Sequence, residues 1–258
     1  MPSAGFVLID VSNSFTKIAF SSRSRLGRIR RLPTSELTVR SLREALDGRP
    51  FLHAVAASVV PDKNAVLRKA LKTGICWVGP DIHLGVGIDY PQPRSIGADR
   101  LANAAAAVAL HGAPAVVVDF GTAVTFDVIS PDKKYIGGVI APGLGVMTEY
   151  LHRRTALLPL IELRQPPRAV GKSTGEAMLS GAVHGYRGLV KEILEQIRRE
   201  HFPRHRATII ATGGDAALIG AGVPLFDAID PQLTLEGLRL IGGLNFPAPP
   251  RDARRGKA

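Results

Sequence analysis

The sequence is poor in cysteine and in aromatic residues. Cys76 is its one cysteine, so neither a disulfide framework within the chain nor a metal cluster built on thiolates is possible. Phe, Trp and Tyr make up 5% of the chain, whereas small and aliphatic residues are abundant. Such residues allow helices to pack closely on a sheet, which favours an α/β fold. The apolar segment ICWVGP predicts a strand with Cys76 buried in the core.

Long uninterrupted hydrophobic runs are also missing. A membrane-spanning helix needs about 18 or more continuously apolar residues, and every stretch of that length is broken by Gly, Pro or charge. The first residues lack the charged segment and the apolar core of a secretory signal peptide. The sequence therefore predicts a cytoplasmic protein with no membrane partner.

Acidic residues are scarce relative to basic ones. Lys and Arg number 33 and Asp and Glu 22, which gives a net charge of +11. Part of the excess lies in residues 23–31 and in the Pro-rich tail 247–258, which is predicted to be disordered. A basic surface can bind nucleic acid, but no aromatic residues alternate with these arginines to stack on bases. We therefore interpret the basic stretch as a solvated surface and expect no nucleic-acid partner.

Two segments of the chain resemble each other. LIDVSNSFTKIAF (residues 8–20) and VVDFGTAVTFDVI (residues 117–129) both begin as an apolar strand, reach an aspartate, turn on small residues and continue as a second strand. Each is predicted to be a β-hairpin, and the offset between them is 109 residues throughout. The aligned pairs are Asp10 and Asp119, Ser12 and Gly121, Asn13 and Thr122, and Thr16 and Thr125.

Repetition at about half the chain length predicts two related α/β domains, residues 1–115 and 116–246. Apolar periodicity predicts amphipathic helices in both halves, and Gly112 is predicted to end the third of them. The predicted helices are 37–48, 61–74, 96–112, 143–159, 174–201 and 233–245; residues 207–219 are predicted to be a strand, a glycine turn and a helix, and residues 224–229 a strand.

The two hairpin turns have the composition of phosphate-binding loops. Small residues leave backbone N–H groups free to point at a phosphate, and Ser, Asn and Thr add short donors. The aspartate before each turn fits such a site if a cation lies between it and the phosphates. Lys17 is placed to neutralise phosphate charge, and the TGG at 212–214 could close over the nucleoside. One hairpin of this kind is usually only a turn, but the pair with TGG downstream indicates a nucleotide site.

The same motifs resemble the acetate and sugar kinase/heat-shock/actin superfamily. Within it, four stretches resemble type III pantothenate kinases: YPQPRSIGADRLANAAAA (90–107), DFGTAVTFD (119–127), YIGGVIAPGLGVM (135–147) and GKSTGEAMLSG (171–181). The resemblance runs from residue 8 to about 245. It implies an α/β fold of two similar actin-like (ribonuclease H-like) domains with a cleft between them. It also implies a homodimer, with the helix 174–200 as a plausible dimer element.

The resemblance implies transfer of the ATP γ-phosphate to the 4′-hydroxyl of pantothenate, the first step of coenzyme A biosynthesis. Asp99 is then the general base, Asp119 binds a monovalent cation (potassium or ammonium), and Asp10 positions Mg through the phosphate cluster. Pantothenate contacts are implied for Tyr90, Gly97, Ala98, Asp99, Arg100 and Thr174. ATP contacts are implied for Asp10, Val11, Ser12, Asn13, Ser14, Phe15, Thr16, Lys17, Gly121, Thr122, Gly213 and Gly214.

Simpler interpretations of these residues stay open. Asp99 could be a favourable charge in the first turn of a helix, and Tyr90 a half-buried loop tyrosine. Ser173 or Thr174 could be the N-cap of the long helix, and Asp127 a strand-end carboxylate.

The first hairpin also departs from the family pattern Asp-x-Gly-Asn-Thr. Ser14 keeps the hydroxyl of the threonine, but Ser12 replaces a glycine. A serine held at positive φ costs on the order of 1 kcal/mol. Either the turn does not need positive φ, or ATP binding is weakened. The alternatives to pantothenate kinase activity are another kinase of the superfamily, a nucleic-acid-binding protein, or a non-catalytic ATP-binding regulatory protein such as a transcriptional accessory factor.

Overall fold

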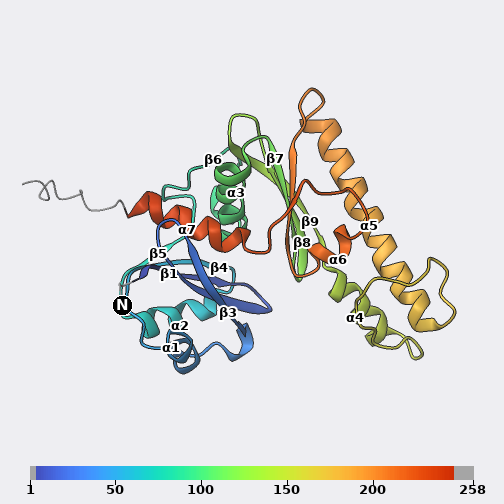
Figure 1. The fold of residues 1–258 in the computed structure, drawn as a ribbon, viewed down its shortest axis with the longest axis horizontal. Coiled ribbons are helices and arrows are strands. Elements are labelled where there is room, and N and C mark those ends of the chain that lie inside the picture. Colours follow the sequence, from blue (N-terminus) through green and yellow to red (C-terminus); the bar gives the residue numbers. More distant parts are fainter. Residues whose placement is uncertain (1–3, 247–258) are drawn as a thin grey trace, which may run out of the picture.

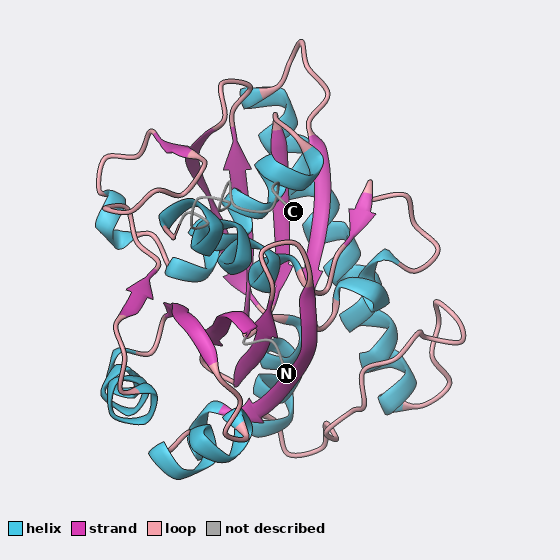
Figure 2. Cartoon of the chain, turned by 60° about the vertical axis from the view of Figure 1, so that its left-hand side comes forward, coloured by secondary structure: helices cyan, strands magenta, loops and turns pink. Residues whose placement is uncertain are grey.

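The computed structural model describes residues 4–246, which form two β-sheets with helices around and between them (Figure 1). The predicted tail 247–258 lies outside the described residues. The first sheet has the strand order β3-β2-β1-β4-β5 and the second the order β11-β10-β7-β8-β9-β6. Figure 2 shows the two sheets one above the other, with helices flanking each.

The strands of each sheet come almost entirely from one part of the chain. The first sheet contains β1 (Ala4–Val11), β2 (Phe15–Ser21), β3 (Leu26–Pro33), β4 (Phe51–Ser58) and β5 (Ile75–Trp77). The second contains β6 (Gly87–Ile88), β7 (Ala115–Phe120), β8 (Ala123–Ile129), β9 (Lys134–Pro142), β10 (Thr208–Gly213) and β11 (Ala228–Ile229). In both, an antiparallel three-strand meander is extended by parallel strands. The α/β fold with two similar halves is therefore confirmed.

Helices cover the sheets on both faces. They are α1 (Val39–Leu46), α2 (Pro61–Leu71), α3 (Ala98–His111), α4 (Leu144–Arg154), α5 (Thr174–His201), α6 (Ala216–Gly220) and α7 (Leu233–Asn245), with short 3-10 turns at Thr34–Glu36 and Pro93–Ser95. One face of the first sheet packs on α1 and α2 and the other on α7. α3 packs on α7 and also on β7 and β8, so this helix pair lies between the two sheets.

Local sequence explains most helix ends. Thr38 caps α1 by accepting the backbone N–H of Ser41, whose side chain in turn accepts the N–H of Thr38. α2 begins at Pro61, and α3 ends before Gly112 as predicted. α5 and α7 have the predicted bounds. No helix of residues 4–246 is long and apolar enough to span a membrane.

Three predictions about local structure are wrong. α4 ends at Arg154 rather than near residue 159, because the Thr155 hydroxyl bonds back to the Leu151 carbonyl and Thr155 is extended. The predicted strand 224–229 shrinks to β11, and the N–H of Leu225 donates to the nearby carbonyl of Val223 rather than to a neighbouring strand. Cys76 lies in the short strand β5 but is only partly buried.

The division at residue 115 stays a prediction. β6 comes from the first half of the chain yet pairs with β9 of the second sheet, and α7 comes from the second half yet packs on β1 and β4. The chain therefore crosses between the two sheets more than once. The contact between α3 and α7 helps to fix how the two sheets lie relative to each other.

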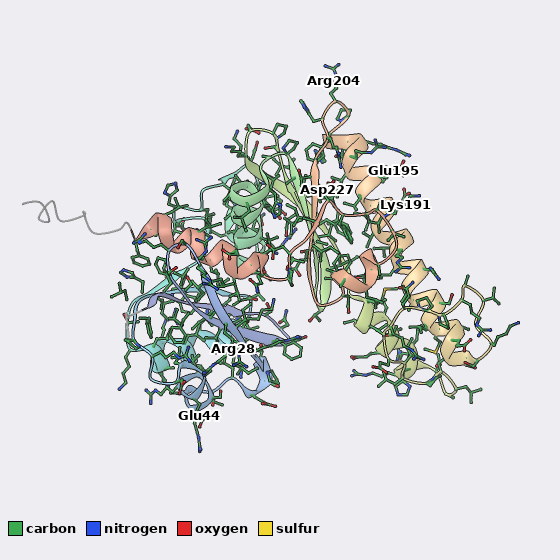
Figure 3. All side chains as sticks on the ribbon, in the orientation of Figure 1. Arg28, Glu44, Lys191, Glu195, Arg204 and Asp227 are labelled. Atoms are coloured by element: carbon green, nitrogen blue, oxygen red, sulfur yellow. The ribbon has the colours of Figure 1, made fainter. Side chains whose placement is uncertain are left out.

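The basic stretch has structural contacts of its own. Arg30 donates to the carbonyl oxygen of Ala45 at the end of α1 and pairs with Asp47 at 3.3 Å. The guanidinium of Arg31 lies over the ring of Phe15, 3.4 Å from its centroid. Arg28, by contrast, is exposed on β3, and Lys191 and Glu195 lie along α5, far from the first sheet (Figure 3).

Candidate active site

The turns of the two hairpins meet between the sheets. The hydroxyl oxygens of Ser14, in the β1–β2 turn, and Thr122, in the β7–β8 turn, lie 2.8 Å apart. The two repeated segments therefore face each other, as their resemblance suggested. Because a hydrogen bond already joins the turns, phosphates could enter between them only if the turns separate.

The two hairpins differ in length by one residue. Asp10 lies opposite Lys17 in the first hairpin, whereas Asp119 lies opposite Thr125 in the second. The predicted offset of 109 residues is therefore confirmed for the strands before the turns. It is wrong for the strands after the turns, because the first turn has one extra residue. The counterpart of Thr125 is Lys17 and not Thr16, so a lysine lies opposite the first aspartate and a threonine opposite the second.

Two of the residues assigned to ATP have side chains that face away from the turns. Val11 and Thr16 are fully buried, and Val11 packs in the core beneath α1 and α2. The Thr16 and Thr34 hydroxyls are 3.0 Å apart, and Thr34 donates to the carbonyl oxygen of Ser12. Their side chains thus brace the turn from behind, while the side chains of Asn13, Ser14 and Phe15 are exposed.

Asp10 is more enclosed than Asp99 and Asp119. It accepts a hydrogen bond from the Ser12 hydroxyl at 3.1 Å, and Lys17 Nζ lies 3.8 Å from its other oxygen. Burial, together with the charges of Asp99 and Asp119, raises the pKa of Asp10 to about 7 against the lowering effects of Lys17 and of the Ser12 hydrogen bond. Ser12 is not at positive φ, so the departure from the family glycine introduces no backbone strain.

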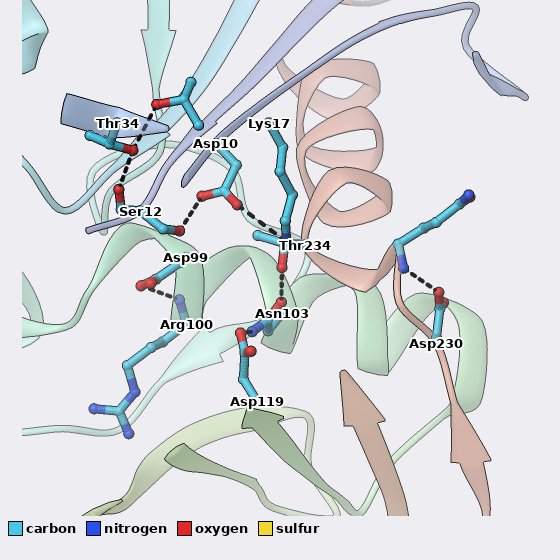
Figure 4. Close-up of polar contacts among 12 residues, drawn as sticks. Asp10, Ser12, Lys17, Thr34, Asp99, Arg100, Asn103, Asp119, Asp230 and Thr234 are labelled. Atoms are coloured by element: carbon cyan, nitrogen blue, oxygen red, sulfur yellow. Dashed lines mark hydrogen bonds and ion pairs between the residues drawn. The ribbon is translucent and has the colours of Figure 1, made fainter. Parts of the chain in front are cut away.

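Asp119 is held by a chain of hydrogen bonds that starts on α7. The Thr234 hydroxyl donates to Asn103 Oδ1 at 2.8 Å, and Asn103 Nδ2 donates to Asp119 Oδ2 at 2.9 Å (Figure 4). Burial raises the pKa of Asp119, while the Asn103 hydrogen bond and Lys17 lower it. Asn103 and Thr234 are site residues that the sequence did not assign. The available signal for Asn103 was an asparagine within a predicted helix that is otherwise rich in alanine.

Asp99 lies in the first turn of α3, on the helix face that carries Asn103. One of its oxygens accepts the backbone N–H of Arg100 at 2.8 Å. Burial first and the charge of Asp119 second raise the pKa of Asp99. Gly97 caps the helix and Ala98 is its first residue, so the GADR motif forms the start of α3 beside both hairpins.

Arg100 turns away from these carboxylates (Figure 4). Its Nε donates to Asp127 Oδ1 at 2.6 Å, and its guanidinium lies 5.7 Å from the ring centroid of Tyr135. The Tyr90 ring meets Tyr135 edge-on with centroids 6.0 Å apart. Asp127 is fully buried in the middle of β8, so its interpretation as a strand-end carboxylate is wrong.

The TGG segment packs directly on the second hairpin. Gly213 has a φ of +91°, and a Cβ there would lie 2.4 Å from the carbonyl oxygen of Phe120. A side chain is therefore excluded both by conformation and by space. The N–H of Gly214 donates to the same carbonyl at 2.9 Å. Gly213 and Gly214 are thus next to Gly121 and Thr122.

Thr174 is not brought together with the other assigned residues. It is the exposed first residue of α5, and Ser173 is the N-cap, accepting the N–H of Glu176 at 3.2 Å. α5 packs on α4 and α6. The N-cap interpretation therefore holds for Ser173 but leaves Thr174 free at the surface.

The carboxylates are suited to a cation that takes its remaining ligands from a bound phosphate group and from water. The charges of Asp99 and Asp119 raise the pKa of Asp10, and the charge of Asp119 raises that of Asp99, while Lys17 lowers the pKa values of Asp10 and Asp119. Among residues 4–246 no three His, Cys, Asp or Glu side chains are grouped to enclose a metal ion alone. Mg²⁺ commonly binds one or two carboxylates and takes its other ligands from phosphates and water. The donor set suits that mode of binding.

Two cavities of the structure lie away from this cluster. One of about 730 Å³ is lined by residues of the 80–95 segment, including Asp81 and Arg94, which form an ion pair at 3.3 Å. The other, of about 570 Å³, lies between β3 and α1 and is lined by Arg28 and Arg30. Neither contains the assigned carboxylates.

Comparisons with known proteins agree with this geometry. The sequence profile of the family described as "Type III pantothenate kinase" matches residues 6–196. A type III pantothenate kinase of Akkermansia muciniphila is 54% identical over 93% of this chain and 99% of its own length. One of Methylacidiphilum infernorum is 43% identical over 92% of this chain and 87% of its own.

Solved structures that resemble the chain share its fold. A putative 2-dehydro-3-deoxygalactonokinase of Sinorhizobium meliloti superposes with a TM-score of 0.61 at 15% identity, over 97% of this chain and 100% of that one. A putative Baf family transcriptional activator of Campylobacter jejuni gives 0.58 at 19% identity, over 91% and 96%. At these identities the likeness concerns the fold alone. The profile match and the identity to curated relatives over nearly the whole chain show that it belongs to the type III pantothenate kinase family.

Proposed function

We propose that this kinase transfers the γ-phosphoryl group of Mg-ATP to the 4′-hydroxyl of pantothenate, the first step of coenzyme A biosynthesis. The observation that carries the proposal is the start of α3. Asp99 lies close enough to the hairpin carboxylates for its charge to raise the pKa of Asp10 and for that of Asp119 to raise its own, while the next residue, Arg100, pairs with Asp127 of β8. Pantothenate has an alcohol at one end and a carboxylate at the other, so its two ends match these two side chains.

Asp99 acts as the general base in this reaction. Its raised pKa makes it a better proton acceptor than an exposed carboxylate. It takes the proton of the 4′-hydroxyl as that oxygen attacks the γ-phosphorus. Lys17 and the backbone N–H groups of the two turns hold the phosphates in line for attack. Bound Mg²⁺ neutralises charge that develops on the phosphate oxygens.

We assign Asp119 as the residue that binds the monovalent cation. One of its oxygens is fixed by Asn103, and its charge repels that of Asp99. A potassium or ammonium ion there would offset this repulsion while the Asn103 contact keeps the carboxylate in place. Carboxylate and amide oxygens are suitable ligands for such a hard cation.

The enzyme works as a homodimer in this proposal. α4 and the start of α5 project from the rest of the chain (Figure 1), and α4 exposes large apolar side chains that a partner could cover. These are Val146, Met147, Tyr150 and Leu151. Thr174 lies on the same projection, so we assign it to the pantothenate site of the partner subunit. We place the enzyme in the cytoplasm, where its ATP is available.

The test is ADP release from Mg-ATP with and without pantothenate, in potassium or ammonium and then in sodium. The variant Asp99→Asn is compared with Asp62→Asn, since Asp62 also lies in the first turn of a helix, α2. We expect pantothenate-dependent turnover, a loss of about 10²–10⁴-fold in Asp99→Asn, and a change below about twofold in Asp62→Asn.

Equal effects of the two substitutions would instead mean that Asp99 is only a helix-dipole charge. ATP binding without turnover on pantothenate would favour the regulatory alternative. Turnover in sodium equal to that in potassium would contradict the role given to Asp119.

A further inference from the structure

Outside the cluster of Asp10, Asp99 and Asp119, the ion pair of Arg100 and Asp127 is the most buried charged contact among the residues that the structure describes. Arg100 comes from the start of α3 and Asp127 from the middle of β8, and their closest atoms, Nε and Oδ1, are 2.6 Å apart. The Asp127 side chain is fully buried and that of Arg100 is 15% exposed. Because the two residues are far apart in the sequence and largely buried, the tertiary fold brings them together and holds the pair in place.

The pair leaves hydrogen-bonding capacity unused. Asp127 engages the guanidinium through Nε only, and neither Nη nitrogen of Arg100 has a hydrogen-bond acceptor among the residues that the structure describes. Nη2 is itself buried. A buried donor without an acceptor costs about 1–3 kcal/mol. A bound anionic group would offset this cost.

Neighbouring residues on β8 and β9 restrict the position of the Arg100 guanidinium. Asp127 lies opposite Gly138 of the neighbouring strand β9, and a Cβ at Gly138 would be 2.6 Å from Arg100 Nη2. The bare backbone at Gly138 therefore admits the guanidinium, and the Tyr135 ring lies next to it. With the Nε edge fixed and the strand behind it, the guanidinium can rotate little.

We propose that Asp127 is a positioning residue, which holds Arg100 by Nε so that its Nη side binds the carboxylate of the acceptor and selects for that charge. This inference rests on the proposed function, because it concerns the same acceptor. The carboxylate of pantothenate would accept an N–H bond on the Nη side of the guanidinium from Nη1, because Nη2 is buried next to Gly138 of β9. Asp127 touches neither substrate and acts through Arg100.

Asp127→Asn tests the proposal, with Asp132→Asn as its control. Both aspartates belong to the β8–β9 hairpin region and pair with a basic residue, but the pair of Asp132 with Lys134 is exposed. kcat and KM are measured for pantothenate and for the uncharged analogue in which CH₂OH replaces the carboxylate. We expect Asp127→Asn to raise the KM for pantothenate about 10–100-fold. The kcat, the KM for ATP and all constants for the analogue should change less than about threefold, and Asp132→Asn should resemble the parent enzyme.

A double-mutant cycle with Arg100→Lys then shows whether the effect passes through Arg100. In that background Asp127→Asn should add little, because lysine has no Nε–Nη fork to position. Equal losses for pantothenate and the analogue, or a full effect in the lysine background, would mean that Asp127 supports the fold only. An unchanged KM for pantothenate would overturn the inference as well.

The parent enzyme provides a second measurement if Asp127→Asn does not fold. The side-chain N–H resonances of Arg100 are identified by their loss in Arg100→Lys. Saturation with pantothenate should shift the Nη protons and leave the Nε proton in place. A shift of Nε alone, or none, overturns the inference. Absence of parent turnover on pantothenate overturns the proposed function, whereas turnover without charge selectivity overturns only this inference.

Discussion

Ser12 shows how one residue can depart from a family pattern without loss. The family glycine at this place suggested a turn that needs positive φ, but the serine backbone is not in that region. Its hydroxyl donates to Asp10, which lowers the pKa of that carboxyl and supports its charged form. The departure therefore adds a contact to the site.

Asp10 itself carries a cost for the fold. Burial raises its pKa from 3.8 in the unfolded chain to about 7 in the folded one. Between these values the folded state holds a proton that the unfolded state has lost, so the free energy of unfolding falls as the pH rises. The destabilisation is absent below about pH 4 and complete above about pH 7.

We therefore expect Asp10→Asn to be more stable than the parent enzyme at pH 8, by about 1–3 kcal/mol or about 5 °C in Tm. This gain should shrink towards pH 5, and turnover should be lost. The measurement is thermal unfolding at both pH values without nucleotide or divalent metal. Asp132→Asn is the control, since its exposed carboxyl has a pKa lowered to about 2 and does not titrate in this range. A gain that is equal at pH 5 and pH 8 would contradict the expectation.

At the scale of elements, the pair α3–α7 links the site to the rest of the chain. α3 carries Asp99, Arg100 and Asn103, and α7 supplies the Thr234 hydroxyl that orients Asn103. α7 belongs to the second half of the sequence but packs on β1 and β4 of the first sheet. A contact on α7 can thus affect a carboxylate on β7.

Thr234→Val should raise the KM for ATP about 3–10-fold and lower the free energy of unfolding by about 1–2 kcal/mol. The substitution keeps the shape of the side chain but leaves the buried Asn103 oxygen without its donor. Thr148→Val is the matched control, because the buried Thr148 hydroxyl bonds only to carbonyls of its own helix, α4. ATP kinetics and urea unfolding of the two variants provide the comparison. The same KM for ATP in both variants would exclude the proposed link.

At the scale of the whole molecule, the projection formed by α4 and the start of α5 exposes apolar side chains, which we expect a second subunit to cover. Tyr150 is 58% exposed and Leu151 44%, although both are large and apolar. A stable dimer interface buries about 800 Å² on each subunit, with aromatic residues near its centre. The exposed face of α4 has this character.

Tyr150→Glu is expected to convert a dimer to a monomer in sedimentation velocity and to reduce turnover, because a charge at the centre of an apolar interface is costly to bury. Leu52→Glu is the control, since Leu52 is 62% exposed on β4 of the first sheet, away from α4. A monomeric parent enzyme, or a dimer that both variants keep, would show that the interface lies elsewhere.

Local patterns were enough for much of this fold. The bounds of α5 and α7, the end of α3 at Gly112 and both hairpins follow from periodicity, capping and turn residues. The end of α4 was missed because the Thr155 hydroxyl competes for a helix carbonyl, a choice that periodicity does not reveal. The extra residue in the first turn was missed for a similar reason, since only strand pairing fixes the register.

Residue order and short-range pattern were enough to establish the fold class, the repeated aspartate hairpins and the family. The tertiary structure decided which charges meet. It set Lys17 beside Asp10, joined Thr234 to Asp119 through Asn103, and buried Asp127 against Arg100. Hydrogen bonds and ion pairs act over a few ångströms, and these partners are brought within that range only when the two sheets pack around α3 and α7.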